Sequence, residues 1–292
     1  MILSFIDYLH IERRYSPHTL TAYRSDLESF ESFIKEDDLE TNIQDVSTAH
    51  IRSWVVYLLE QDHASRTVQR KISSLKGFFK YLRKIGYRKD NPVRVINGPK
   101  VPKRLPTTVE KDGMAMLFES DEMFGEDLSG LRDRALLTLF YSTGMRLAEV
   151  ISSKLADLSY MDMTLRVIGK RDKERIIPLS GPAIAGIKSY LELRDREGVH
   201  SDLLFLTDSA EPLYPKFVYR KVNHYLGRVS SLSKRSPHVL RHTFATHLLE
   251  NGAELQSIKE ILGHTNLAAT QVYTHNSIER LKKIHGQAHP KG

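Results

Sequence analysis

The sequence predicts a mainly α-helical protein with two domains, of which the second contains one small antiparallel β-hairpin. Apolar residues recur at helical spacing along most of the chain, and one place shows two short strand patterns around a polar turn. Between residues 91 and 106, four prolines interrupt regular structure. We therefore expect a helical domain at 1–95, a basic proline-rich linker at 96–106 and a second domain at 107–292.

The helices of the first domain are predicted by apolar residues at steps of three and four. Ser16 is a favourable N-cap, and Pro17 suits the first helical position that follows it. A second helix begins near Arg66 and ends before Gly86, a residue type common just after helices, and a third includes 51–60. The predicted buried faces of the first two consist of Leu20, Tyr23, Leu27, Phe30 and Ile34, and of Val68, Ile72, Leu75, Phe79 and Leu82.

The second domain is predicted to be mostly helical, with the hairpin near its start. Its strands are expected at Met163–Ile168 and Glu174–Leu179, joined by the polar stretch 169–173. An apolar-rich helix at Arg132–Tyr141 precedes them and ends near Gly144. Later helices are expected at Pro182–Glu197, Lys216–Ser230, His238–Asn251, Leu255–Leu262, Asn266–Tyr273 and Ser277–His285.

The composition limits the class of protein. Hydrophobic residues make up 40% of the chain, enough for a core, and the mean hydropathy is −0.37. The longest obvious apolar run, Trp54–Leu59, is far below the ~20 residues of a membrane span, and polar residues interrupt the N-terminal segment, unlike a secretion signal. The absence of cysteine excludes disulfides, thiolate metal ligands and a cysteine nucleophile. We therefore expect a soluble, cytoplasmic protein without membrane contact.

The distribution of charge favours a polyanionic partner. The net charge is +7 and the pI about 9.3, which alone decides little. Residues 26–45, however, carry eight acidic side chains and one lysine, whereas residues 66–94 carry ten lysines or arginines and one aspartate. This contrast predicts one basic surface on the first domain for phosphates. The candidate DNA-binding residues are Arg66, Arg70, Lys76, Lys80 and Arg83 on the second helix, and Lys100, Lys103 and Arg104 in the linker.

The candidate catalytic residues are informative as an ordered set. His-x-x-Arg occurs three times and tyrosine thirteen times, so neither is specific alone. Lys170 lies twenty-four residues after Arg146. His264 lies twenty-three residues after Arg241 and nine before Tyr273. In chain order, the set consists of Arg146, Lys170, His238, Arg241, His264 and Tyr273.

This ordered set resembles the catalytic domain of tyrosine site-specific recombinases, the phage integrase family, and most closely its Xer branch. The runs Ser236–His247 and Leu262–His275 are the most specific parts. The resemblance covers nearly the whole chain, because the first domain, including Tyr15–Thr19 and Tyr23, is similar to the helical, SAM-like core-binding domain of the family. The function it implies is Xer-type resolution of chromosome or plasmid dimers at cell division.

The resemblance implies that Arg146 and Arg241 hold the phosphate under attack. Guanidinium groups suit this role because they donate paired hydrogen bonds to phosphate oxygens and neutralise charge. Glu149, three residues after Arg146 on an expected helix, is expected to orient these groups. We expect no metal, nucleotide or other cofactor, because the arginines supply positive charge and the covalent intermediate retains the bond energy.

Tyr273 matches the nucleophile of the family. A free tyrosine has a pKa near ~10, so forming the phenolate at pH 7 costs roughly 4 kcal/mol, which neighbouring groups must offset. His238 matches the general base and lies one helical turn before Arg241. The resemblance further implies that His264 hydrogen-bonds the scissile phosphate and that Lys170 protonates the leaving 5′ oxygen.

The implied reaction is a transesterification that forms a 3′-phosphotyrosyl link and frees a 5′ hydroxyl, after which a 5′ hydroxyl of another duplex reseals the strand. The implied partner is double-stranded DNA with a specific recombination site, bound by a homo- or heterotetramer. A second Xer recombinase and an FtsK-type DNA translocase are further candidate partners.

Two alternatives remain open on sequence alone. An integrase of a phage, integron or transposon would use the same chemistry. A non-catalytic DNA-binding protein could retain the fold without the reaction. A type IB topoisomerase shares similar chemistry but is not expected to match the first domain so well.

Overall fold

The structure, a computed structural model, describes residues 1–37, 39–102, 107–120, 122–169, 174–263 and 286. The chain forms two compact units, Met1–Arg104 and Leu105–Gly292, each considered by itself below. Among the helices that the structure describes, none has the length and apolar character needed to cross a membrane.

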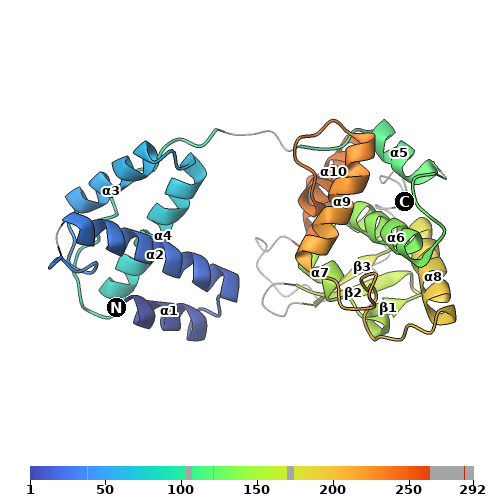
Figure 1. Ribbon diagram of the computed structural model, residues 1–292, viewed down its shortest axis with the longest axis horizontal. Coiled ribbons are helices and arrows are strands. Elements are labelled where there is room, and N and C mark those ends of the chain that lie inside the picture. The colour runs from blue at the N-terminus through green and yellow to red at the C-terminus, as the bar shows by residue number, and fades with distance from the viewer. Residues whose placement is uncertain (38, 103–106, 121, 170–173, 264–285, 287–292) are drawn as a thin grey trace. The chain divides into compact units, whose positions relative to one another are not determined.

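The described part of the first unit is helical, as predicted. Its helices are α1 (Ile2–Ile11), α2 (Pro17–Asp37), α3 (Thr48–Glu60) and α4 (Ser65–Lys84) (Figure 1). The predicted N-cap of α2 is confirmed, because the Thr19 backbone N–H donates to Ser16 Oγ at 3.4 Å. Gly86 follows α4 with a φ of 77°, a left-handed conformation that favours glycine.

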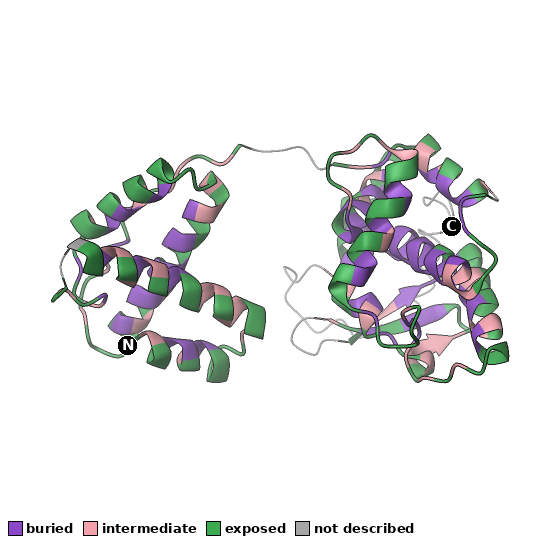
Figure 2. Cartoon of the chain, viewed as in Figure 1, coloured by how far each residue is buried: buried purple, intermediate pink, exposed green. Residues whose placement is uncertain are grey.

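The inward faces of these helices form one core, coloured purple in Figure 2. All five residues of the predicted apolar stripe on α4 are buried. Phe30 of α2 packs against Trp54 of α3, with ring centroids 4.7 Å apart. Beyond α4, Val93 and Ile96 also belong to this core, and the Gln69 side chain donates to the Pro99 carbonyl at 2.8 Å. The core therefore continues past the last helix of the unit.

The second unit combines helices with one small sheet. Its elements are α5 (Lys111–Glu119), α6 (Leu128–Thr143), α7 (Leu147–Ile151), a 3-10 turn (Leu155–Asp157), β1 (Leu158–Ser159), β2 (Thr164–Ile168), β3 (Glu174–Pro178), α8 (Gly181–Arg196), α9 (Pro215–Val229), α10 (Pro237–Glu250) and α11 (Leu255–Leu262). The predicted hairpin of β2 and β3 is confirmed. The additional strand β1 pairs antiparallel with β2, so the sheet has the order β1-β2-β3. The helices expected at 266–273 and 277–285 lie outside the described residues.

Helix α6 lies inside the second unit and packs against α8 and α10 (Figure 1). Nearly all its residues from Ala135 to Thr143 are fully buried, including polar ones, so it has no solvent face along this length. A helix that is apolar on all sides is stable only in such a position. Helix α11 packs on α10 through a separate small core that includes Phe244, Leu248 and Ile258.

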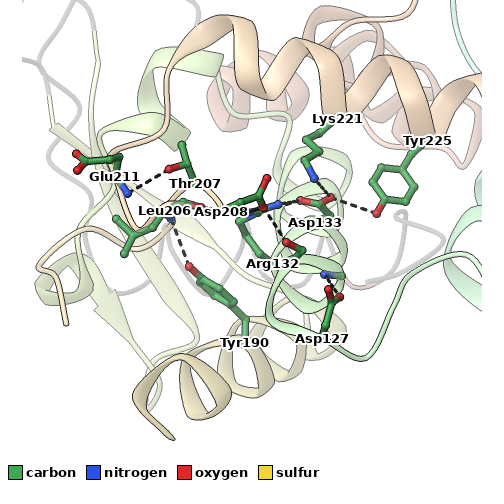
Figure 3. Close-up of polar contacts among 12 residues, drawn as sticks. Asp127, Arg132, Asp133, Tyr190, Leu206, Thr207, Asp208, Glu211, Lys221 and Tyr225 are labelled. Atoms are coloured by element: carbon green, nitrogen blue, oxygen red, sulfur yellow. Dashed lines mark hydrogen bonds and ion pairs between the residues drawn. The ribbon is translucent and has the colours of Figure 1, made fainter. Parts of the chain in front are cut away.

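A buried polar network fixes the beginning of α6 (Figure 3). Asp133, 1% exposed, accepts from Arg132 at 2.7 Å, from the Tyr225 hydroxyl at 3.2 Å and pairs with Lys221 at 2.9 Å. Arg132 also donates to Asp208 at 2.6 Å. Burial, and then the Asp133 charge, raise the pKa of Tyr225, which keeps its hydroxyl protonated and donating. The network thus joins α6 to α9 and to the segment that contains Asp208.

Candidate active site

The end of α6 is a sharp turn that only glycine fits. Gly144 has a φ of 61°, and a Cβ there would lie 2.5 Å from Phe244 Cδ1 and 2.7 Å from Leu262 Cδ2. The backbone of α6 therefore ends directly against α10 and α11. Arg146 follows two residues later, so this turn determines where its side chain begins.

Arg146 and Glu149 are bound to each other, although not as neighbours on one helix. Arg146 is the N-cap residue of α7 and has extended backbone, which corrects the expectation that both residues lie on one helix. Its backbone N–H donates to Glu149 Oε2 at 2.8 Å, and its Nη1 donates to Oε1 at 2.8 Å. This is a capping interaction, in which the carboxylate satisfies a free N–H at the helix start. Glu149 is 3% exposed and Arg146 35% exposed at their side chains.

Arg175 on β3 is a third member of this group that sequence reasoning missed. Its Nη1 and Nη2 donate to Glu149 Oε1 and Oε2 at 2.7 and 2.8 Å. Burial alone would raise the pKa of Glu149, but the hydrogen bonds and charge of Arg175 outweigh it, and the pKa is lowered to about 2. Strand alternation contained the signal: Arg175 lies on the same face as buried Ile177, where an arginine needs a partner.

Arg241 of α10 lies beside Arg146 and is held by backbone carbonyls. Its Nη1 donates to the Gly144 carbonyl at 2.5 Å and its Nη2 to the Leu262 carbonyl at 2.8 Å. Arg146 Nη2 donates to the next carbonyl, that of Gly263, at 3.0 Å. Burial, followed by the charge of Arg146, lowers the pKa of Arg241 to about 10. The group of Arg146, Arg175, Arg241 and Glu149, called the arginine cluster below, therefore has three cations around one carboxylate.

His238 lies one turn before Arg241 on α10, as predicted. Its side chain is accessible. Partial desolvation, and then the neighbouring His242 and Arg241, lower the pKa of His238 from its usual value. The imidazole is therefore neutral at neutral pH and can accept a proton.

Several predicted site residues lie outside the described residues. These are Lys170, His264, Tyr273, Lys103 and Arg104. In sequence, Lys170 precedes β3 by four residues and His264 directly follows Gly263. The described residues thus bring together Arg146, Glu149, His238 and Arg241 of the predicted set.

The candidate DNA-binding residues of the first unit are exposed, and so is Lys100. On α4, Arg66, Lys76, Lys80 and Arg83 have accessible side chains, as has Arg70, which also donates to Asp26 at 2.6 Å. Two further basic residues from the charge-rich segment do not belong to this surface. Lys71 is 7% exposed, and Arg88 Nη1 donates to the carbonyls of Gln44 and Val46.

Comparison with known proteins assigns both units to one family. Residues 109–280 match the phage integrase family, and residues 2–86 match the phage integrase N-terminal SAM-like domain. The chain therefore belongs to the phage integrase family, and the predicted resemblance to tyrosine recombinases is confirmed.

Among its relatives are recombinases of the Xer branch. The chain is 37% identical over 314 residues to tyrosine recombinase XerC of Chlorobaculum parvum, covering 98% of this chain and 93% of that one. It is 36% identical over 297 residues to tyrosine recombinase XerD of Proteus mirabilis, covering 100% and 96%. The solved XerH site-specific recombinase bound to a palindromic difH substrate, a post-cleavage complex, has the same fold, with a TM-score of 0.71, 23% identity and coverage of 97% and 83%.

Proposed function

We propose that this tyrosine recombinase cuts and rejoins DNA at a specific site through a covalent link to Tyr273. The observation that carries the proposal is the arginine cluster, in which three cations share one carboxylate among the described residues. Such a surplus of partly buried positive charge favours an anion, and a phosphate oxygen fits two adjacent guanidinium groups. Electrostatic stabilisation of this kind supplies most of the catalysis in phosphoryl transfer.

The described geometry supports specific roles. Arg146 and Arg241 bind the nonbridging oxygens of the scissile phosphate, and Glu149 orients Arg146. His238, neutral and accessible beside Arg241, takes the proton of the attacking hydroxyl. Tyr273 attacks phosphorus, His264 hydrogen-bonds the phosphate and Lys170 protonates the leaving 5′ oxygen. The phosphodiester is thereby exchanged for a 3′-phosphotyrosyl ester and a free 5′ hydroxyl.

The first unit supports the proposal through its basic helix. We assign DNA binding to the domain at 1–95, catalysis to that at 107–292, and backbone contact to the connecting residues 96–106. The accessible cations of α4, together with Lys100, Lys103 and Arg104, bind phosphates without reading sequence. A cytoplasmic location, double-stranded DNA as substrate and a four-subunit assembly belong to the same proposal.

A nicked duplex that traps the covalent intermediate tests the reaction. The site is first selected from fragments of the host chromosome by binding to the protein. Wild type and Tyr273→Phe are then incubated with the nicked site, without divalent metal or ATP, and separated on a denaturing gel. A slowly migrating protein–DNA adduct with wild type alone is the expected result. Binding without an adduct, also after a second Xer recombinase or an FtsK-type translocase is added, contradicts the proposal and favours the non-catalytic DNA-binding alternative.

Dimer resolution is favoured over integration of a mobile element. Relatives named XerC and XerD match this chain over more than nine tenths of their own length. A dimeric plasmid with two direct copies of the selected site tests this assignment. Conversion to monomers, with little joining of separate circles, is expected; preferential joining of separate circles would instead indicate an integrase.

A further inference from the structure

Glu149 has its hydrogen-bonding capacity filled from three directions. An ionised carboxylate offers about four acceptor positions. Arg175 occupies two of them with a parallel pair of donors, and the Arg146 backbone N–H occupies a third. One position is left for the Arg146 side chain, whose Nη1 fills it at 2.8 Å.

This occupancy determines how Arg146 presents its donors. A guanidinium group has five N–H donors. One donor of Arg146 binds Glu149 and one binds the Gly263 carbonyl, so the others have no partner among the described residues. A carboxylate and a guanidinium normally prefer a two-fold paired geometry. Without Arg175, Glu149 could adopt that geometry with Arg146, which would draw the guanidinium inward and use donors that now face an accessible position.

We propose that Arg175 is a positioning residue for the transesterification: by filling two acceptor positions of Glu149, it restricts Arg146 to one side-chain bond there and keeps the remaining Arg146 donors free for the scissile phosphate. This role rests on the proposed function. Arg175 does not touch the phosphate in this scheme. It acts through Glu149 and Arg146.

The surroundings of Arg175 hold it in the required orientation. The residue is 7% exposed and pairs with Val167 across the β2–β3 ladder, so the sheet fixes its backbone. Its guanidinium lies against the backbone of Gly263, where an added Cβ would be 3.1 Å from Nε and 3.2 Å from Cζ. Among the described residues, nothing accepts a hydrogen bond from its buried Nε. Arg175 thus connects the sheet, α7 and the end of α11 through one side chain.

Arg175→Gln tests the proposal against a matched control, Arg132→Gln. Arg132 is also a buried arginine, 2% exposed, but it binds Asp133 and Asp208 at the other end of α6. Three quantities are measured for both variants and wild type: the melting temperature, the Kd for the intact site, and the single-turnover rate of adduct formation on the nicked duplex.

The expected result separates chemistry from binding and from stability. Arg175→Gln should form the adduct about 10- to 100-fold more slowly, the range found when groups that orient ligands are removed, with a Kd within about twofold of wild type. Arg132→Gln should lower the melting temperature at least as much but leave the rate within about threefold. Arg175→Lys keeps the charge without the paired donors and should recover only part of the rate.

Other outcomes overturn the assignment. If Arg175→Gln cleaves within threefold of wild type, or if the rate loss in Arg132→Gln equals it, Arg175 has only a structural role. If Arg175→Gln does not fold, Arg175→Lys decides: a wild-type rate contradicts the proposal. Failure of the proposed function is distinct, because wild type itself would then form no adduct.

Discussion

Two buried carboxylates at opposite ends of α6 are surrounded by cations in different proportions. At the beginning, Asp133 and Asp208 balance Arg132 and Lys221, and the Tyr225 hydroxyl completes the network (Figure 3). At the end, Glu149 alone faces Arg146, Arg175 and Arg241. The first network is closed, whereas the second keeps a positive surplus for a ligand. The ratio of charges, more than their burial, distinguishes a structural network from a candidate site.

Substitution of Arg241 should have the largest effect. Arg241→Ala removes one of the two donors assigned to the phosphate, and loss of a comparable donor costs about 10²- to 10³-fold in rate. Single-turnover adduct formation with the nicked duplex measures this loss, while the Kd should change little. An unchanged rate would show that the surplus charge of the arginine cluster has no part in the reaction.

Gly144→Ala should disturb the backbone that supports the cluster. The new Cβ would meet Phe244 and Leu262 at less than 3 Å, at a φ that disfavours side chains. Overpacking and the left-handed conformation together should lower the free energy of unfolding by about 3 kcal/mol, measured by urea denaturation. Gly198→Ala is the control: its φ is also positive, at 71°, but nothing lies within 4 Å of its Cβ position, so its loss should be smaller.

The pH dependence of stability should report on Glu149. Its pKa is lowered to about 2 in the folded protein. The carboxylate therefore stabilises the fold fully above its unfolded pKa of ~4.5, and this contribution, on the order of 2–3 kcal/mol, is lost as pH falls toward 2. Glu149→Gln should be less stable than wild type at pH 7, and the difference should shrink between pH ~4.5 and 2. A difference in unfolding free energy that stays constant over this range would contradict the assignment.

Lys221→Met should have the smallest effect and shows the other side of the comparison. Asp133 retains Arg132 and Tyr225 as partners, so the loss of unfolding free energy should be about 1–2 kcal/mol. Adduct formation should remain within about threefold of wild type. A loss of rate similar to that of Arg241→Ala would mean that the balanced network also takes part in the reaction.

Local patterns predicted the elements well, and contacts across the chain much less. The apolar stripe on α4, the cap at Ser16 and the one-turn spacing of His238 and Arg241 all depend on neighbouring residues. The pairing of Arg241 with the Gly144 carbonyl joins residues far apart in sequence, and periodicity alone does not indicate it. The short helix α7 was missed, because five residues carry too little periodic signal.

Charge counting was limited for a related reason. Lys71 was counted with the basic segment, but it is buried beside Asp26 and over the Trp54 ring. Arg175 was overlooked because it follows a polar turn, where an exposed cation is ordinary. In both cases the sequence shows a charge, and only the three-dimensional partner shows whether it faces solvent or the interior.

The carbonyls that hold Arg146 and Arg241 come from the C-terminal ends of two helices, α6 at Gly144 and α11 at Leu262 and Gly263. Each helix C-terminus carries a partial negative charge of roughly half an elementary charge. Peptide dipoles thus steady the two cations in the absence of DNA, and unlike carboxylates they add no net charge. The protein can keep its arginines in place before the substrate arrives, while the electrostatic potential that attracts a phosphate remains positive.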